Sequence, residues 1–268
     1  MTFTEKLRTA AAKNASWLCV GLDLDPEKLP EPFKRNPNGL LDYAKKIIET
    51  TKDLVCAYKP NSAFFEALGV PGLQALEKII RSVPSGIPVI LDAKRADIGN
   101  TSSRYARAVF DILGADAVTA NPYMGFDSLE PFFAYGAKHT FVLVLTSNSG
   151  AADFEQLQVG GKPLYMRVAE KIGKWNSSSN IGAVVGATKP AGIRQVRRIL
   201  KDEIFLIPGL GTQAGDLESS VKHAFAGKGT AVFNVSRDII LAPDFDSMAA
   251  KAKQYRDAIN SFLPKSAG

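Results

Sequence analysis

Residues 54–94, LVCAYKPNSAFFEALGVPGLQALEKIIRSVPSGIPVILDAK, contain the repeating unit from which the fold can be predicted. Two short runs in it, Leu54–Lys59 and Ile87–Asp92, are nearly continuous in apolar residues, as in strands that are buried on both faces. Between these runs, Gly72–Arg81 places leucine and isoleucine on one face at helical spacing. Strand, helix and strand in this order predict a parallel βαβ unit.

The same alternation continues in both directions along the chain. The other expected strands are Trp17–Asp23, Asp116–Ala120, Thr140–Thr146, Ile181–Gly186, Ile204–Gly209 and Thr230–Val235. The other expected helices are Leu40–Thr50, Thr101–Leu113, Ser128–Tyr135, Leu164–Trp175, Ala191–Leu200, Asp216–Phe225 and Phe245–Phe262. Eight strands alternating with eight helices in about 250 residues are typical of an α/β protein with a (β/α)₈ barrel, also called a TIM barrel.

We therefore expect one domain over residues 1–268, with a short helix before the first strand. A doubly wound open sheet is the alternative, because periodicity does not reveal whether a sheet closes. The count of eight strands and the absence of GxGxxG after the first strand favour the barrel. Two long loops, Leu24–Gly39 and Ser147–Lys162, follow strands and are candidates for lids over the mouth of the barrel.

Composition narrows the class of protein. The chain has 268 residues, of which 46% are hydrophobic and 22% charged, which excludes disordered, collagenous and coiled-coil proteins. No apolar run reaches the ~20 residues that span a bilayer, and the N-terminus, which carries Glu5, lacks the apolar segment of a signal peptide. Cys19 and Cys56 lie in apolar runs, so we expect buried, reduced thiols and a cytoplasmic protein.

Charged residues gather where the expected strands end. Asp23 ends the first strand, Lys59 the second and Asp92 the third, and Lys94 and Asp97 follow the third strand closely. The carboxyl ends of parallel strands meet at one mouth of a barrel, so we expect these side chains to converge there. Flanking carboxylates keep an ammonium protonated, whereas a Schiff-base lysine needs a lowered pKa. The pattern therefore predicts that Lys94 donates a proton.

Other chemistries find less support. His139 precedes the fifth strand and His223 lies in an expected helix, and we interpret both as structural. Histidine triads and zinc sites are therefore disfavoured. The carboxylates of Asp23, Asp92 and Asp97 are potential Mg²⁺ ligands, but the interleaved lysines compete for them, so a metal site ranks second.

An anion site is expected on the other side of the mouth. The segments PGLGTQAGD (208–216) and NVSRD (234–238) follow the seventh and eighth strands, where barrels of this class commonly bind phosphate. Gln213 and Arg237 are the candidate phosphate ligands. The net charge of +6 therefore suits an anionic metabolite.

Binding of nucleic acid is the non-enzymatic alternative. The stripe of Arg194, Arg197, Arg198 and Lys201 lacks interleaved aromatic residues and resembles a solvated outer helix face.

The segment LDAKRADIGNT (91–101) resembles the DxKxxDxxxT signature of the orotidine 5′-monophosphate decarboxylase family. Similar family segments follow in family order: VGLDLDP, AYKPNSAFFEALG, TANPYMG, LTSNSGA, VVGATKP, PGLGTQAGD and NVSRD. The length and the NPYMG and SNSGA elements are most similar to the longer bacterial subgroup. The DxKxxD core also occurs in Mg²⁺-dependent sugar-phosphate decarboxylases and aldolases, which remain the alternative. The YKPN and GNT segments favour the first family.

The resemblance implies decarboxylation of orotidine 5′-monophosphate to UMP, the last step of de novo pyrimidine nucleotide synthesis, without a cofactor or metal. Lys94 would protonate C6 of the pyrimidine, and Asp92 would lie near the substrate carboxylate. Lys59 and Asp23 would bind the ribose hydroxyls. Asp97 and Thr101 would reach into the site of a neighbouring subunit, which implies a homodimer with shared active sites.

The remaining roles implied by the resemblance concern binding. Ser147 would hydrogen-bond the pyrimidine, although Thr146 next to it also carries a hydroxyl and the alignment leaves both open. Gln213 and Arg237 would hold the 5′-phosphate. Asn121 and Thr188 lie in family segments and would also belong to the substrate-binding residues.

Overall fold

The computed structural model describes residues 1–36, 38–210 and 217–264, and its centre is an eight-stranded parallel sheet. The strands are β1 (Leu18–Leu22), β2 (Ala57–Pro60), β3 (Ile90–Arg95), β4 (Ala117–Ala120), β5 (His139–Leu145), β8 (Ile181–Val185), β9 (Ile204–Pro208) and β10 (Thr230–Val235). Their order in the sheet is β2-β1-β10-β9-β8-β5-β4-β3. All eight strands overlap the expected apolar runs, although β2 and β3 each begin three residues later than expected.

The ends of this order, β2 and β3, lie next to each other. Isolated bridges pair Tyr58 with Val89 and Asn61 with Asp92. The amide of Tyr58 also donates a hydrogen bond of 3.1 Å to the carbonyl of Pro88. The sheet therefore returns on itself along a sparsely bonded seam, which confirms the (β/α)₈ barrel and rules out the open sheet.

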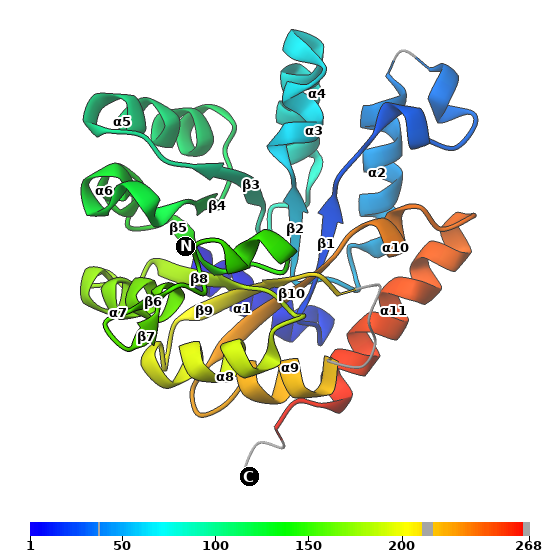
Figure 1. Cartoon of the computed structure of the whole chain (residues 1–268). Helices are drawn as coiled ribbons and strands as arrows, with labels where there is room; N and C mark the ends of the chain where they lie inside the picture. The colour runs from blue at the N-terminus through cyan, green and yellow to red at the C-terminus, as the bar shows by residue number, and fades with distance from the viewer. Residues whose placement is uncertain (37, 211–216, 265–268) are drawn as a thin grey trace.

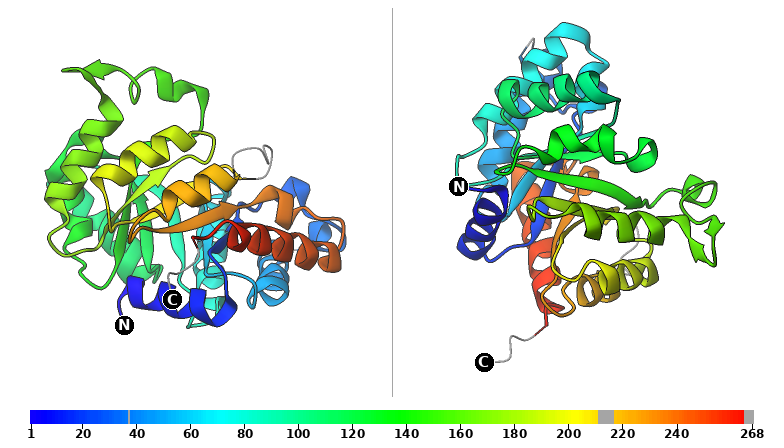
Figure 2. Two further views of the ribbon diagram at one scale, coloured as in Figure 1. Left: turned by 90° about the horizontal axis from the view of Figure 1, so that it is seen from below. Right: turned by 90° about the vertical axis from the view of Figure 1, so that its left-hand side faces the viewer.

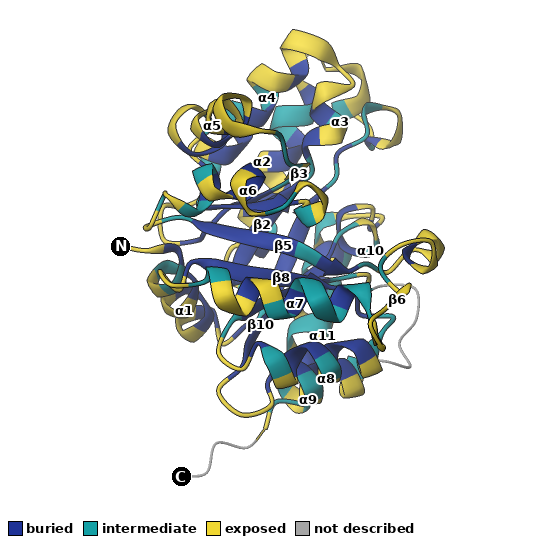
Figure 3. Ribbon diagram, turned by 60° about the vertical axis from the view of Figure 1, so that its left-hand side comes forward, coloured by how far each residue is buried: buried dark blue, intermediate teal, exposed yellow. Residues whose placement is uncertain are grey.

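Helices surround the strands, as Figure 1 shows. They are α1 (Phe3–Asn14), α2 (Gly39–Thr51), α3 (Ser62–Glu66), α4 (Gly69–Ser82), α5 (Gly99–Arg107), α6 (Phe126–Phe133), α7 (Leu164–Trp175), α8 (Pro190–Ile199), α9 (Leu217–Ala224), α10 (Arg237–Ile240) and α11 (Phe245–Ser261). Figure 3 shows the buried strands enclosed by helices whose outer faces are exposed. The core therefore lies inside the barrel and between the strands and the helix ring.

Two segments with their own local structure differ from the sequence-based expectation. The segment expected as one helix, Thr101–Leu113, is α5 followed by a π-helical turn at Ala108–Ile112. The loop 147–162 contains a 3₁₀ turn, Ser149–Ala152, and most of a short hairpin. The hairpin strands are β6 (Gln158–Val159) and β7 (Lys162–Pro163). In Figure 2 this hairpin projects from the barrel.

A basic residue on α8 is also placed differently from the expectation. Arg197 is buried, not solvated. Its guanidinium donates to the carbonyls of Leu200, Glu203 and Thr230 and stacks on Phe205 at 3.5 Å from the ring centroid. The guanidinium thus satisfies carbonyls after α8 and at the start of β10, which no charge pattern in the sequence reveals.

Helix α1 covers the end of the barrel opposite the hairpin (Figure 2). Phe3 stacks on His139 with ring centroids 4.9 Å apart and meets Phe141 edge-on at 5.7 Å. Cys19 and Cys56 belong to the same apolar cluster, and both are buried, free thiols, as predicted.

His139 lies in this apolar environment without a hydrogen-bond partner on either ring nitrogen among the described residues. Burial lowers its pKa from 6.5 to about 3. Between pH 6.5 and about pH 3, His139 is protonated in the unfolded chain but neutral in the folded barrel. The free energy of unfolding therefore falls as the pH drops below 6.5, at about 1.4 kcal/mol per pH unit.

We expect His139 to remove about 3 kcal/mol of stability between pH 6.5 and pH 4. In His139→Leu the pH dependence of urea unfolding should lose this slope. His223→Leu is the matched control, because His223 is only half-buried and should contribute a smaller slope. An unchanged pH dependence in His139→Leu would contradict the assignment.

Candidate functional site

A chain of charges crosses the mouth of the barrel. The ammonium of Lys59, on β2, lies 2.8 Å from Oδ2 of Asp92, on β3. The ammonium of Lys94 lies 2.7 Å from Oδ1 of the same carboxylate. The Lys59 side chain is only 4% exposed and that of Asp92 12%, whereas Lys94 is 49% exposed. One carboxylate thus joins a buried ammonium and an accessible one across the β2–β3 seam.

The pKa values of the buried pair reflect this arrangement. Burial alone would lower the pKa of Lys59, but Asp92 and Asp23 outweigh it and raise this pKa above its ordinary value. Burial alone would raise the pKa of Asp92, but Lys59 and Lys94 hold it well below its usual range. Lys59 and Asp92 are therefore both ionised at neutral pH and present fixed charges to a ligand.

Thr119, at the end of β4, completes the array, and the sequence analysis missed it. Its hydroxyl donates to Oδ1 of Asp92 at 2.8 Å and accepts from the amides of Ala93 and Lys94. Lys94 itself has a left-handed φ of +48°, which is uncommon for a residue with a Cβ. Only the pairing of β3 with β4 could have identified Thr119, because it lies 25 positions beyond Lys94 in the sequence.

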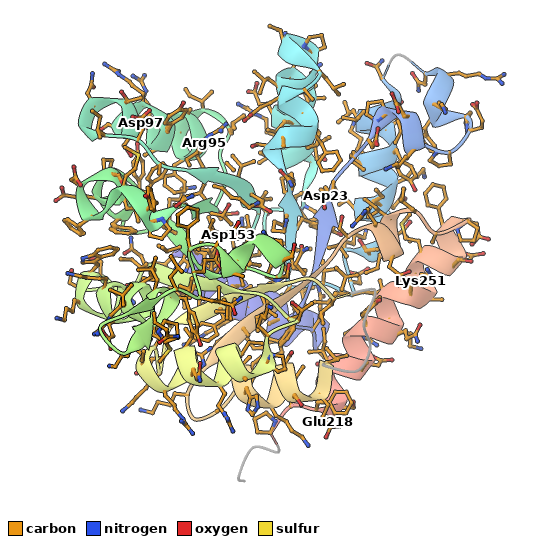
Figure 4. The ribbon with its side chains drawn as sticks, viewed as in Figure 1. Asp23, Arg95, Asp97, Asp153, Glu218 and Lys251 are labelled. Atoms are coloured by element: carbon orange, nitrogen blue, oxygen red, sulfur yellow. The ribbon has the colours of Figure 1, made fainter. Side chains whose placement is uncertain are left out.

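A cavity of about 550 Å³ opens above this array. The residues that line it are Asp23, Lys59, Asn61, Asp92, Pro208, Gly209, Leu210, Asn234, Ser236, Arg237 and Asp238. Figure 4 shows Asp23 at the end of β1. Oδ1 of Asp23 and Oδ1 of Asn234 are buried without a hydrogen-bond partner in the described part of the chain. Buried polar atoms are normally satisfied, so these two oxygens point to a ligand with donors.

Arg237 brings a cation to the far side of the cavity. It begins α10 and is exposed. The neighbouring Asp238 is turned toward α11, where it pairs with Lys251 at 2.7 Å and accepts from Tyr255 at 2.9 Å. The guanidinium of Arg237 has no ion-pair partner within residues 1–36, 38–210 and 217–264, which suits an anionic ligand. The second candidate for phosphate binding, Gln213, lies outside the described residues.

The structure distinguishes Ser147 from Thr146. The hydroxyl of Thr146 bonds to Asn148 and Glu155, and its amide donates to Glu155 at 2.7 Å. Ser147 is exposed and lies against Gly209, which lines the cavity: a Cβ on Gly209 would be 3.5 Å from Oγ of Ser147. Ser147 is therefore the hydroxyl that is available to a ligand.

Two further predicted residues make hydrogen bonds to loop backbone. The hydroxyl of Thr188 donates to the carbonyl of Ser147 at 3.3 Å. Oδ1 of Asn121 accepts from the amide of Tyr123 at 3.0 Å, at the start of the 3₁₀ turn Pro122–Met124. In this structure both shape loops at the mouth of the barrel.

Asp97 and Thr101 stand apart from the array. Figure 4 shows Asp97 beside α5, far from Asp23. Oδ1 of Asp97 accepts from the amide of Ile98, and Thr101, near the start of α5, is exposed. Strand β3 ends at Arg95, and neither Asp97 nor Thr101 is among the residues that line the cavity. Of the five charged residues expected to converge, Asp23, Lys59, Asp92 and Lys94 do so within one chain, and Asp97 does not.

Two features of the described residues concern metal binding and membrane insertion. They contain no group of three or more His, Cys, Asp or Glu side chains arranged to hold a metal ion. None of their helices combines the length and apolar character that crossing a bilayer requires. The metal-free prediction remains to be tested by experiment.

Comparison with known proteins identifies a single family. Residues 16–252 match the orotidine 5′-phosphate decarboxylase / HUMPS family. Orotidine 5′-phosphate decarboxylase of Roseiflexus sp. (strain RS-1) is 46% identical over 98% of this chain and 99% of the relative. The Herpetosiphon aurantiacus protein of the same name is 48% identical over 99% of this chain and 98% of its own length.

Solved structures agree. The structure of Leishmania donovani OMP decarboxylase superimposes with a TM-score of 0.87 at 41% identity and covers 98% of both chains. Leishmania donovani UMP synthase gives a TM-score of 0.89 at 42% identity, over 98% of this chain and 56% of that one. On this evidence the chain belongs to the orotidine 5′-phosphate decarboxylase / HUMPS family.

Proposed function

We propose that this protein decarboxylates orotidine 5′-monophosphate to UMP, the last step of de novo pyrimidine nucleotide synthesis, without metal or cofactor. Membership of the family supports the activity. The observation that carries the mechanism is the Lys59–Asp92–Lys94 array, in which Lys59 and Asp92 line the cavity and Lys94 pairs with Asp92. In this proposal the whole chain, residues 1–268, is one domain that works as a homodimer in the cytoplasm.

The chemical step places Lys94 at the reacting carbon. As the bond between C6 and the carboxylate carbon breaks, carbon dioxide leaves and the electron pair stays on C6 in the plane of the ring. The ammonium of Lys94 stabilises this charge and donates its proton to C6, and solvent then reprotonates the amine. The ion pair to Asp92 fixes the ammonium before the reaction, so little reorganisation is needed in the transition state.

Asp92 has a second effect in this mechanism. The substrate carboxylate would lie near the carboxylate of Asp92, and the repulsion between them disappears when carbon dioxide departs. Lys59 keeps Asp92 ionised from the side opposite Lys94.

The rest of the cavity binds the nucleotide. The unpartnered oxygen of Asp23, together with Lys59, binds the ribose hydroxyls. Arg237 holds the 5′-phosphate with Gln213, and Ser147 hydrogen-bonds the pyrimidine. Phosphate contacts far from C6 supply binding energy that orients the ring against Lys94. Asn121 and Thr188 support these contacts through the loops that they shape.

The second subunit would complete the site. Neither Asp97 nor Thr101 lines the cavity of its own chain, and neither is buried, so both are free to enter the site of a neighbour in a two-fold dimer. Large apolar side chains are exposed close to the start of α6, among them Tyr123 at 79%, Met124 at 46% and Phe126 at 40%. An exposed apolar surface of this kind is typical of a protein–protein contact.

A Mg²⁺-dependent reaction on a sugar phosphate is the alternative within the same family. The donor set does not favour it, because Asp92 already accepts from Lys59, Lys94 and Thr119. A cation would have to displace these partners. Asp23, the other carboxylate lining the cavity near the array, would then be the one carboxylate left there to bind the cation.

The test is the loss of orotidine 5′-monophosphate absorbance near neutral pH, with and without EDTA. We expect equal rates under both conditions, and UMP as the product. Loss of activity in EDTA that Mg²⁺ restores would support the sugar-phosphate alternative. A gel shift with random DNA or RNA covers the non-enzymatic alternative, and no shift is expected.

A further inference from the structure

Strands β3 and β4 fall out of register at the array. Leu91 pairs with Val118 and Arg95 pairs with Ala120, so three residues of β3 face one residue of β4. The three are Asp92, Ala93 and Lys94, and the one is Thr119. A bulge of this kind re-aims side chains but leaves backbone amides without ladder partners. Here it contains both the shared carboxylate and the proton donor of the proposed function.

The Thr119 hydroxyl replaces the missing ladder bonds. It accepts from the amide of Ala93 at 3.1 Å and from that of Lys94 at 3.0 Å, and it donates to Oδ1 of Asp92 at 2.8 Å. A hydroxyl has one proton and two lone pairs, and all three are used here. Since both lone pairs accept from amides, the proton can only point to Asp92, and it suits an ionised carboxylate. Thr119 is itself only 1% exposed.

We infer that Thr119 is a positioning residue: its one hydroxyl holds the Asp92–Lys94 bulge open and aims the carboxylate that fixes Lys94. The inference rests on the proposed function for its catalytic consequence. It explains how Lys94 keeps a left-handed φ of +48°, because the amide of that residue is held at the geometry it needs.

Thr119→Val removes the hydroxyl at nearly constant volume. We expect kcat for orotidine 5′-monophosphate to fall about 10- to 100-fold, the range for losing a hydrogen bond to a charged group. UMP should bind within about threefold of the wild type, because ribose and phosphate contacts dominate ground-state binding. Thr119→Ser keeps the hydroxyl and should restore kcat. The matched control is Thr140→Val, since Thr140 is a buried threonine on β5 whose hydroxyl has no partner among the described residues.

Thr119→Cys replaces Thr119→Val in this test if the valine variant does not fold, because a thiol fills the space of the hydroxyl but forms only weak hydrogen bonds. A kcat within about threefold of the wild type in Thr119→Val or Thr119→Cys would overturn the inference. The inference would also be overturned if Thr119→Ser were as slow as Thr119→Val, or if Thr119→Val lost affinity for UMP in proportion to its loss of kcat. If the wild type and Thr140→Val do not turn over the substrate, the proposed function fails instead. Hydrogen exchange of the backbone amides then still tests the bulge. The amides of Ala93 and Lys94 should exchange slowly in the wild type and in Thr119→Ser. Fast exchange of these two amides in either protein would overturn the inference.

Discussion

Lys94→Ala is expected to lower turnover of orotidine 5′-monophosphate by at least about 10⁴-fold while the protein still binds UMP. The change removes both the proton for C6 and the cation nearest to the developing charge, and each effect alone is typically worth about 10²- to 10³-fold or more. Ground-state binding survives because Asp23, Lys59 and Arg237 remain in the cavity.

The fold should tolerate this substitution. Alanine keeps the Cβ, so the left-handed backbone at position 94 is no more strained than before. Asp92 keeps Lys59 and Thr119 as partners, so its charge stays compensated. Lys201→Ala, an exposed lysine outside the cavity, is the control and should be as active as the wild type. Calorimetric titration with UMP separates binding from chemistry, and substantial turnover in Lys94→Ala would remove this residue from the mechanism.

Mixing two inactive variants is expected to restore activity. In the proposed dimer each subunit lends Asp97 to the site of the other, so homodimers of Lys94→Ala and of Asp97→Ala should each be nearly inactive. A heterodimer has one site with both changes and one with neither. With random pairing, half of the dimers are mixed and roughly a quarter of all sites are wild type. Activity should therefore return to about a quarter of the wild-type value.

Subunit exchange must be checked for this result to count. Differently tagged subunits, purified in tandem after mixing, report whether heterodimers formed. If they formed and activity did not return, Asp97 acts in its own subunit and the shared-site hypothesis is wrong. The side chain of Ile98, next to Asp97, is 61% exposed in the single chain. Its burial from solvent on dimerisation would be an independent sign that this surface lies in the dimer interface.

Most of the barrel was predictable because most strands are buried on both faces. Leu164–Trp175 and Thr230–Val235 were predicted with the bounds that the structure has. The failures concern segments without a periodic apolar pattern, such as Ser62–Glu66 and the β6–β7 hairpin. The π-helical turn after α5 was missed because its side chains keep a helical pattern while the hydrogen bonds shift.

The site was predictable where a charge directly ends a strand. Lys59, Asp92 and Lys94 meet for that reason. Asp97 shows the limit of the argument, since three residues beyond Lys94 the chain has already turned toward α5. Thr119 is invisible to such reasoning, because its role depends on a change of register between two strands and not on its neighbours in sequence.

The ion pair between Lys59 and Asp92 also joins the two strands where the barrel has only isolated backbone bridges. The charges that perform the proposed chemistry therefore help to hold the ring of strands together. A substitution at either position during evolution would therefore destabilise the barrel and impair the proposed catalysis at the same time. Descent with altered chemistry would thus retain the lysine–aspartate pair and vary the loops around it.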